Sequence, residues 1–143
     1  MKNEPRIVAD TNIVISAVLL PRSIPRKAFD LARIRGRILV SATTIVELEG
    51  VLRRPKFDKY IQEADRLEFM AELVRVAELV QVVHTLDVCR DAKDNAILEL
   101  ALSGRATHIL TGDADLLVLH PFRNISILTA QQFLSDMTEV SSS

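Results

Sequence analysis

Apolar residues along this chain fall into two patterns that predict two kinds of secondary structure. Short apolar runs are typical of buried strands, and longer segments with apolar residues three and four positions apart are typical of amphipathic helices. The short runs cover residues 6–9, 37–40, 107–110 and 125–128, with a further candidate at 80–84. The predicted helices cover residues 12–20, 25–35, 41–54, 63–79, 94–104, 114–119 and a segment that follows Thr129 and Gln132, which have capping-box spacing.

The alternation of strands and helices determines the predicted fold class. Strands separated by helices indicate parallel pairing through right-handed crossovers. We therefore predict an α/β fold, a three-layer α/β/α sandwich with a central parallel sheet of four or five strands. Hydrophobic residues make up 48% of the chain and aromatic residues only 4%, so the core must be largely aliphatic. We expect one domain over residues 1–138 and a disordered polar tail over residues 139–143.

Cysteine usage and apolar run lengths bear on location. Cys89 is the only cysteine, so no disulfide can form within the chain, which is typical of a reducing compartment. A lone cysteine is most often a small buried residue, and a catalytic nucleophile is the second interpretation. No run of about 18 apolar residues exists, and charged or polar residues interrupt the first twenty. We therefore expect a cytoplasmic chain with no signal peptide and no membrane span.

Charge is distributed unevenly, although the formal net charge is only −1. Residues 1–59 hold 12 lysines and arginines against 6 acids, and residues 60–143 hold 6 against 13. The basic half could contact a phosphate backbone. On charge alone, ordinary solvated helix faces are the favoured explanation of the same distribution. The candidate contacts are Arg22, Arg26, Lys27, Arg33, Arg35, Arg37, Arg53, Arg54, Lys56 and Lys59.

Two aspartates follow predicted strands directly. Asp10 comes after the run at 6–9, and Asp113 comes after the run at 107–110 by a Thr-Gly turn. In an open parallel sheet, ligands bind beyond the carboxyl ends of the strands. Both aspartates are therefore expected at the edge where a site would form.

Asp94 lies at the start of a nearly apolar helix. Its neighbours on the same helix face are apolar, and a carboxylate on an interior face is costly unless something charged meets it. The adjacent Asp91, Lys93 and Asn95 are interpreted instead as solvent-facing or capping residues. Asp94 therefore joins the candidate site.

Two glutamates on the predicted helix 41–54 differ in their surroundings. Glu49 precedes Arg53 by four residues, the favourable order for a surface ion pair. Glu47 has no basic residue within one turn and borders an apolar stripe, so it is the better site candidate.

Each acid also has a local explanation. Asp10, Asp94 and Asp113 could each satisfy a helix start or turn, and Glu47 could complete a capping box with Thr44. Carboxylates gathered at one edge cannot all stay ionised without compensation. Oxygen ligands without cysteine or histidine suit Mg²⁺, or Mn²⁺ as a substitute, rather than zinc. The three histidines lack the spacing of a metal pair.

Four segments resemble the PIN-domain family, in the family's order. They are Val8-Ala-Asp-Thr-Asn-Ile-Val-Ile-Ser-Ala17, the stretch 41–54, Asp91-Ala-Lys-Asp-Asn-Ala-Ile-Leu-Glu-Leu-Ala101 and Ile109-Leu-Thr-Gly-Asp-Ala-Asp-Leu-Leu117. The last motif is similar to one in PIN-family toxins of prokaryotic toxin–antitoxin systems.

The resemblance implies a Mg²⁺-dependent ribonuclease with Asp10, Glu47, Asp94 and Asp113 as its four acids. Asp115 matches an auxiliary acid near the metal, Asn12 a small polar residue that orients the first acid, and Thr111 a Ser/Thr near the same site. Cleavage would leave 5′-phosphate and 3′-hydroxyl ends. The resemblance further implies a cognate antitoxin and a homodimer.

Two other functions remain open from the sequence. A Mg²⁺-dependent phosphatase with an aspartyl nucleophile would require an acid where Asn12 stands. A catalytically silent RNA- or protein-binding module would keep the fold without the chemistry, and the complete set of acids argues against it.

Overall fold

A five-stranded parallel sheet forms the centre of the computed structural model, which describes residues 4–142, with side chains described to residue 138. The strands run in the order β3-β2-β1-β4-β5, and each neighbouring pair is parallel. Their bounds are β1 Arg6–Ala9, β2 Arg37–Val40, β3 Glu78–Leu79, β4 His108–Leu110 and β5 Ser126–Leu128. The chain thus leaves the sheet centre at β1 and later returns beside it at β4.

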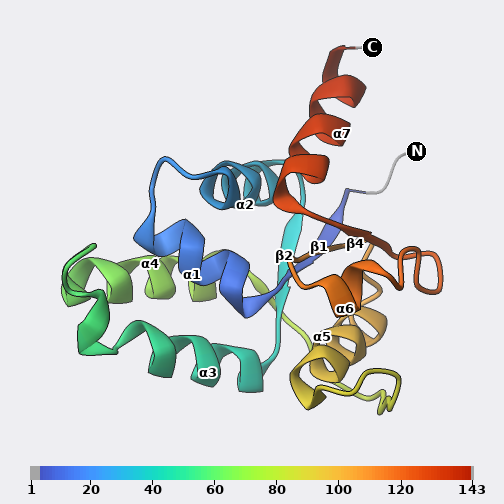
Figure 1. Cartoon of the computed structure of the whole chain (residues 1–143), viewed down its shortest axis with the longest axis horizontal. Helices are drawn as coiled ribbons and strands as arrows, with labels where there is room; N and C mark the ends of the chain where they lie inside the picture. Colours follow the sequence, from blue (N-terminus) through green and yellow to red (C-terminus); the bar gives the residue numbers. More distant parts are fainter. Residues whose placement is uncertain (1–3, 143) are drawn as a thin grey trace.

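Helices cover both faces of this sheet, as Figure 1 shows. One face packs against α1 (Thr11–Leu19), α2 (Ile24–Arg35), α3 (Ala42–Leu52), α4 (Glu63–Val76) and α7 (Ala130–Ser142). The other face packs against α5 (Ala92–Ser103) and the short α6 (Ala114–Leu117). A 3-10 turn, Pro55–Phe57, connects α3 to the loop before α4. The predicted three-layer α/β/α fold is therefore confirmed.

Side-chain alternation in the strands divides the core in two. Ile7 and Ala9 of β1 face the α1–α2 side, whereas Val8 between them faces α5. Such alternation follows from the two-residue period of a strand. Because both faces are covered, β1, β2, β4 and β5 are apolar and buried after their first residue, which makes them recognisable as short continuous runs.

The third strand lies earlier in the chain than predicted. Helix α4 ends at Val76 rather than at residue 79, and the strand is Glu78–Leu79 rather than 80–84. Leu39 of β2 is the register partner of Glu78, whose carboxylate accepts two hydrogen bonds from the Arg6 guanidinium, at 2.9 and 2.6 Å. A charged residue therefore occupies the edge strand, where its side chain reaches a partner on β1.

The last helix begins as predicted and extends further. Thr129 N–H donates to Gln132 Oε1 at 2.9 Å, and Gln132 N–H donates to Thr129 Oγ1 at 3.1 Å, which completes the capping box. Helix α7 then continues to Ser142, into the stretch that was expected to be a disordered tail. Residue 143 lies outside the described residues, and the division into one domain and a tail stays a prediction.

Among the described helices, none combines the length and the apolar character that crossing a bilayer requires.

Candidate active site

Asp10 and Thr111 leave the sheet side by side at its carboxyl edge. Ala9 of β1 and Leu110 of β4 are register partners, and Asp10 N–H donates to Leu110 O at 2.9 Å. The fully buried Thr111 hydroxyl donates to Asp10 Oδ2 at 2.7 Å and accepts from Asp113 N–H at 3.0 Å. One hydroxyl thus links the two predicted acids of the edge.

Asp94, Asp113 and Asp115 form a compact acidic group. Each offers one carboxylate oxygen, and these three oxygens all lie within 4.8 Å of one another. Asp94 is only 5% exposed, and its Oδ2 has no hydrogen-bond partner among the described residues. Burial, and then the charges of Asp113, Asp91, Asp10 and Asp115, raises the pKa of Asp94 to about 6. The three carboxylates therefore concentrate negative charge, and no described residue donates a hydrogen bond to Asp94 Oδ2.

A cavity of about 330 Å³ opens beside this group, between the start of α1, α3 and α5. Asp10, Asn12, Glu47 and Asp94 line it together, so residues from three distant parts of the chain meet there. Asp113 is absent from the lining, although one of its carboxylate oxygens lies within 4.8 Å of an oxygen of Asp94, which does line the cavity. Glu47 is half-buried on the α3 wall and lies outside the three-oxygen group. The predicted acids are therefore brought together as two sets that share Asp94.

The local explanations for these acids are partly correct. Asp10 is the N-cap of α1, Asp91 of α5 and Asp113 of α6, and each carboxylate accepts a hydrogen bond from the backbone N–H two residues on. The capping box proposed for Glu47 is wrong, because Ser41 is the N-cap of α3 and accepts from Thr44 N–H. Capping explains how Asp10 and Asp113 are held in place, but it explains neither Glu47 nor the buried Asp94.

The contacts of Asn12 and Asn95 differ from those that the sequence predicts. The backbone N–H of Asn12 donates to Asp10 Oδ1 at 3.4 Å, so the main chain makes the contact that was expected of the side chain. Asn95 was interpreted as solvent-facing, but it is buried. Its Oδ1 accepts from Val88 and Cys89 N–H, and its Nδ2 donates to Cys89 O. The polarity of Asn95 concealed its role, which is to fix the preceding loop against α5.

Basic residues near the acids are fewer than the sequence suggested. Of the predicted phosphate contacts, Arg54 lines the acid cavity, and Lys93, which was not among them, joins it. Arg90 was also missed, and its Nη2 lies 3.7 Å from Asp115 Oδ2. The hydropathy pattern carries no signal for these residues, because all are exposed.

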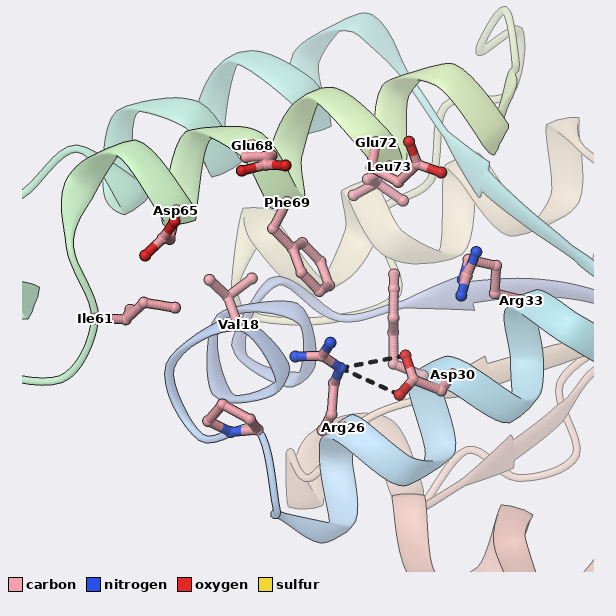
Figure 2. Close-up of a pocket in the computed structure, with 12 residues that line it drawn as sticks. Val18, Arg26, Asp30, Arg33, Ile61, Asp65, Glu68, Phe69, Glu72 and Leu73 are labelled. Atoms are coloured by element: carbon pink, nitrogen blue, oxygen red, sulfur yellow. Dashed lines mark hydrogen bonds and ion pairs between the residues drawn. The ribbon is translucent and has the colours of Figure 1, made fainter.

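Arg26 and Arg33 belong to a different cavity, of about 470 Å³, shown in Figure 2. Arg26 extends from α2 and bonds both oxygens of Asp30 at 3.2 Å, while Phe69 of α4 points into the space between the helices. The two cavities share none of their lining residues. Arg26 and Arg33 are therefore separated from the acid cavity.

Comparison with known proteins gives one family and several relatives. A family model described as PIN domain matches residues 6–115. The uncharacterized protein MJ1680 of Methanocaldococcus jannaschii is 32% identical over 116 residues, which are 80% of this chain and 74% of that protein. VapBC2 from Rickettsia felis, bound to a DNA fragment from their promoter, has a TM-score of 0.58 at 13% identity, covering 85% of this chain and 96% of that one. PAE2754 from Pyrobaculum aerophilum has a TM-score of 0.59 at 15% identity, covering 94% and 90%. The two solved structures bear on the fold alone.

Proposed function

Because the chain belongs to the PIN-domain family, we propose that it is a metal-dependent endoribonuclease that hydrolyses RNA phosphodiester bonds. PIN domains are generally nucleases. The observation that carries the proposal is the buried Asp94 carboxylate, whose Oδ2 lacks a hydrogen-bond partner among the described residues and which lies beside Asp113 and Asp115. A carboxylate in that position is costly unless a cation meets it.

The acidic group fits a hard divalent cation. Its donors are carboxylate oxygens without cysteine or histidine, the set that Mg²⁺ or Mn²⁺ prefers. We assign Asp10, Asp94 and Asp113 as the residues that would hold the cation, with Glu47 binding it directly or through water and Asp115 as an auxiliary acid. A cation held there would stabilise charge on the phosphate and lower the pKa of a water molecule.

Neighbouring residues of the chain would orient the metal-binding carboxylates and assist the reaction. Thr111 orients Asp10 through its hydroxyl and fixes Asp113 through the backbone, and the Asn12 N–H restrains the other Asp10 oxygen. Glu47 faces the reaction space from α3, where it can accept a proton from an attacking water. The two hydrogen bonds to Asp10 keep its carboxylate in one orientation.

Cys89 is a poor candidate for a covalent nucleophile. Burial raises the pKa of its thiol, and the charges of Asp94, Asp115, Asp113 and Asp91 raise it further. The reactive thiolate is therefore disfavoured at neutral pH. This supports hydrolysis by water over a covalent intermediate on Cys89.

We extend the proposal to a toxin of a toxin–antitoxin pair that acts in the cytoplasm as a homodimer with a cognate antitoxin. The support is the resemblance of the Thr111-Gly-Asp-Ala-Asp-Leu-Leu117 segment to PIN-family toxins and the fold shared with VapBC2. Expression of this chain alone should arrest growth, and co-expression of a small antitoxin-like reading frame found directly upstream of its gene should rescue that growth. Unimpaired growth would contradict the toxin assignment and leave the nuclease assignment standing.

The test of the nuclease is cleavage of single-stranded RNA with Mg²⁺, with Mn²⁺ and with EDTA. We expect cleavage that requires metal, leaves 3′-hydroxyl ends and is lost in Asp94→Asn and Asp113→Asn. Asp136→Asn, an exposed carboxylate on α7, is the control that should cleave normally. Metal-independent RNA binding without cleavage would favour the silent binding module, and turnover of a small phosphomonoester would favour the phosphatase.

A further inference from the structure

Arg66 of α4 is a fully buried arginine that does not line the acid cavity. A buried guanidinium is costly unless its donors are bonded. Nε donates to Leu52 O at 2.6 Å, Nη1 donates to Ile61 O, and Nη2 donates to Asp58 Oδ1 at 3.0 Å and to Arg54 O at 3.4 Å. One planar side chain thus joins both ends of the segment 52–61 between α3 and α4.

This clamp fixes the place where α3 ends. The last carbonyl groups of a helix lack partners within the helix, and a cation is favourable there. Arg66 supplies that cation to Leu52, the last residue of α3, and to the Arg54 carbonyl two residues on. The buried Arg66 guanidinium therefore restrains the backbone of Arg54.

Arg54 and Lys93 are cations on the wall of the acid cavity. Arg53, the neighbour of Arg54, is paired with Glu49 at 3.0 Å, but neither Arg54 nor Lys93 forms an ion pair with a described residue. Glu47 and Val51 lie one turn apart on α3, and Arg54, two residues beyond the end of this helix, lines the same cavity. Lys93 precedes Asp94 directly, at the start of α5.

We propose that Arg54 and Lys93 bind the phosphates that flank the scissile one, and that Arg66 is a positioning residue that holds Arg54 for this contact. The inference rests on the proposed function and deepens it. Both cations line the same cavity as Asp10, Glu47 and Asp94, an acidic centre that would otherwise repel a polyanion. They are charged, exposed and free of competing ion pairs with described residues, as a phosphate contact requires.

The first test is the salt dependence of RNA cleavage. Each phosphate contact on a single strand adds about 0.7 to the salt exponent of binding, which is about a fivefold effect at 0.1 M salt. Arg54→Gln and Lys93→Gln should each raise KM about fivefold, lower that exponent by about 0.7 and leave kcat nearly unchanged. Arg105→Gln, which removes an exposed charge outside the acid cavity, is the matched control and should change neither.

Unchanged KM and unchanged salt dependence in Arg54→Gln and Lys93→Gln, with normal cleavage by the unaltered chain, would overturn this inference alone. Absence of cleavage by the unaltered chain would instead overturn the proposed function.

The second test separates positioning from stability. Arg66→Lys keeps the charge but cannot reach all the acceptors at once. It should raise KM and lower the salt exponent as Arg54→Gln does, and it should add little in the double variant, because both changes remove one contact. A lower melting temperature with unchanged KM and salt exponent would overturn the positioning role.

Asp58→Asn keeps the test decisive if Arg66→Lys does not fold, because it weakens only the one carboxylate contact of Arg66. It should shift KM and the salt exponent in the same direction, by less. Values equal to those of the unaltered chain would contradict the role of Arg66.

Discussion

The Thr111 hydroxyl donates to Asp10 Oδ2 at 2.7 Å across 101 residues of sequence. The contact exists because β1 and β4 are adjacent and in register, so that the residues after them meet at the carboxyl edge. Thr111 is fully buried, which shields this hydrogen bond from water. This hydrogen bond ties the orientation of Asp10 to β4, the strand that leads to Asp113.

Thr111→Val should weaken divalent-metal binding with little change in shape. Valine keeps the volume but loses the donor to Asp10 and leaves Asp113 N–H without its acceptor. Loss of such a supporting hydrogen bond typically costs about 10–100-fold in metal affinity. Mn²⁺ titration by calorimetry measures this, and Thr111→Ser should restore the affinity. Equal affinity in the valine and serine variants would contradict the orienting role.

The raised pKa of Asp94 predicts that metal-free protein loses stability as pH rises. The folded pKa is about 6 and the ordinary value 3.8, so between these values the folded chain binds more protons than the unfolded one. The free energy of unfolding therefore falls through that window and stays lower at neutral pH.

Asp94→Asn should remove this penalty. In EDTA at pH 7.5 it should unfold at a higher temperature than the unaltered chain, with a free energy of unfolding larger by about 3 kcal/mol, and the difference should shrink toward pH 4. Thermal unfolding at both pH values measures it, with Asp136→Asn as the control. A destabilised Asp94→Asn at pH 7.5 in EDTA would show that the Asp94 charge is compensated in a way that the structure does not contain.

Glu47→Gln should separate chemistry from metal binding. Glu47 lines the cavity but lies outside the three-oxygen group of Asp94, Asp113 and Asp115. We expect kcat to fall at least tenfold, while saturating Mn²⁺ still raises the melting temperature. Asp113→Asn should lose both the cleavage activity and the Mn²⁺-dependent rise in melting temperature. Loss of the Mn²⁺-dependent shift in Glu47→Gln would instead make Glu47 a principal ligand.

The placement of Asp10, Asp94 and Glu47 on one cavity could be predicted because it follows from general rules. The carboxyl ends of parallel strands share one edge, and an acid on an apolar helix face needs a partner. Arg66 and Asn95 could not be predicted in this way, because their burial is compensated by backbone carbonyl and amide groups of distant loops. Hydropathy assigns such residues to the surface, and the two-residue strand β3 gives too short a pattern to locate.

Gly36 should be intolerant of a side chain, whereas Gly50 should tolerate one. A Cβ placed on Gly36 would lie 2.1 Å from Pro5 O, the carbonyl that accepts Arg37 N–H at 2.8 Å where β2 begins beside β1. The backbone φ of −151° suits any residue, so the cost comes from this contact. Gly36→Ala should therefore destabilise the chain by about 1–3 kcal/mol.

Gly50 lies inside α3 with no atom within 4 Å of the position that an alanine methyl group would take, so Gly50→Ala should stabilise by about 0.5–1 kcal/mol. Urea unfolding of the two variants measures both, and equal stability of Gly36→Ala and the unaltered chain would contradict the close approach of β1 and β2.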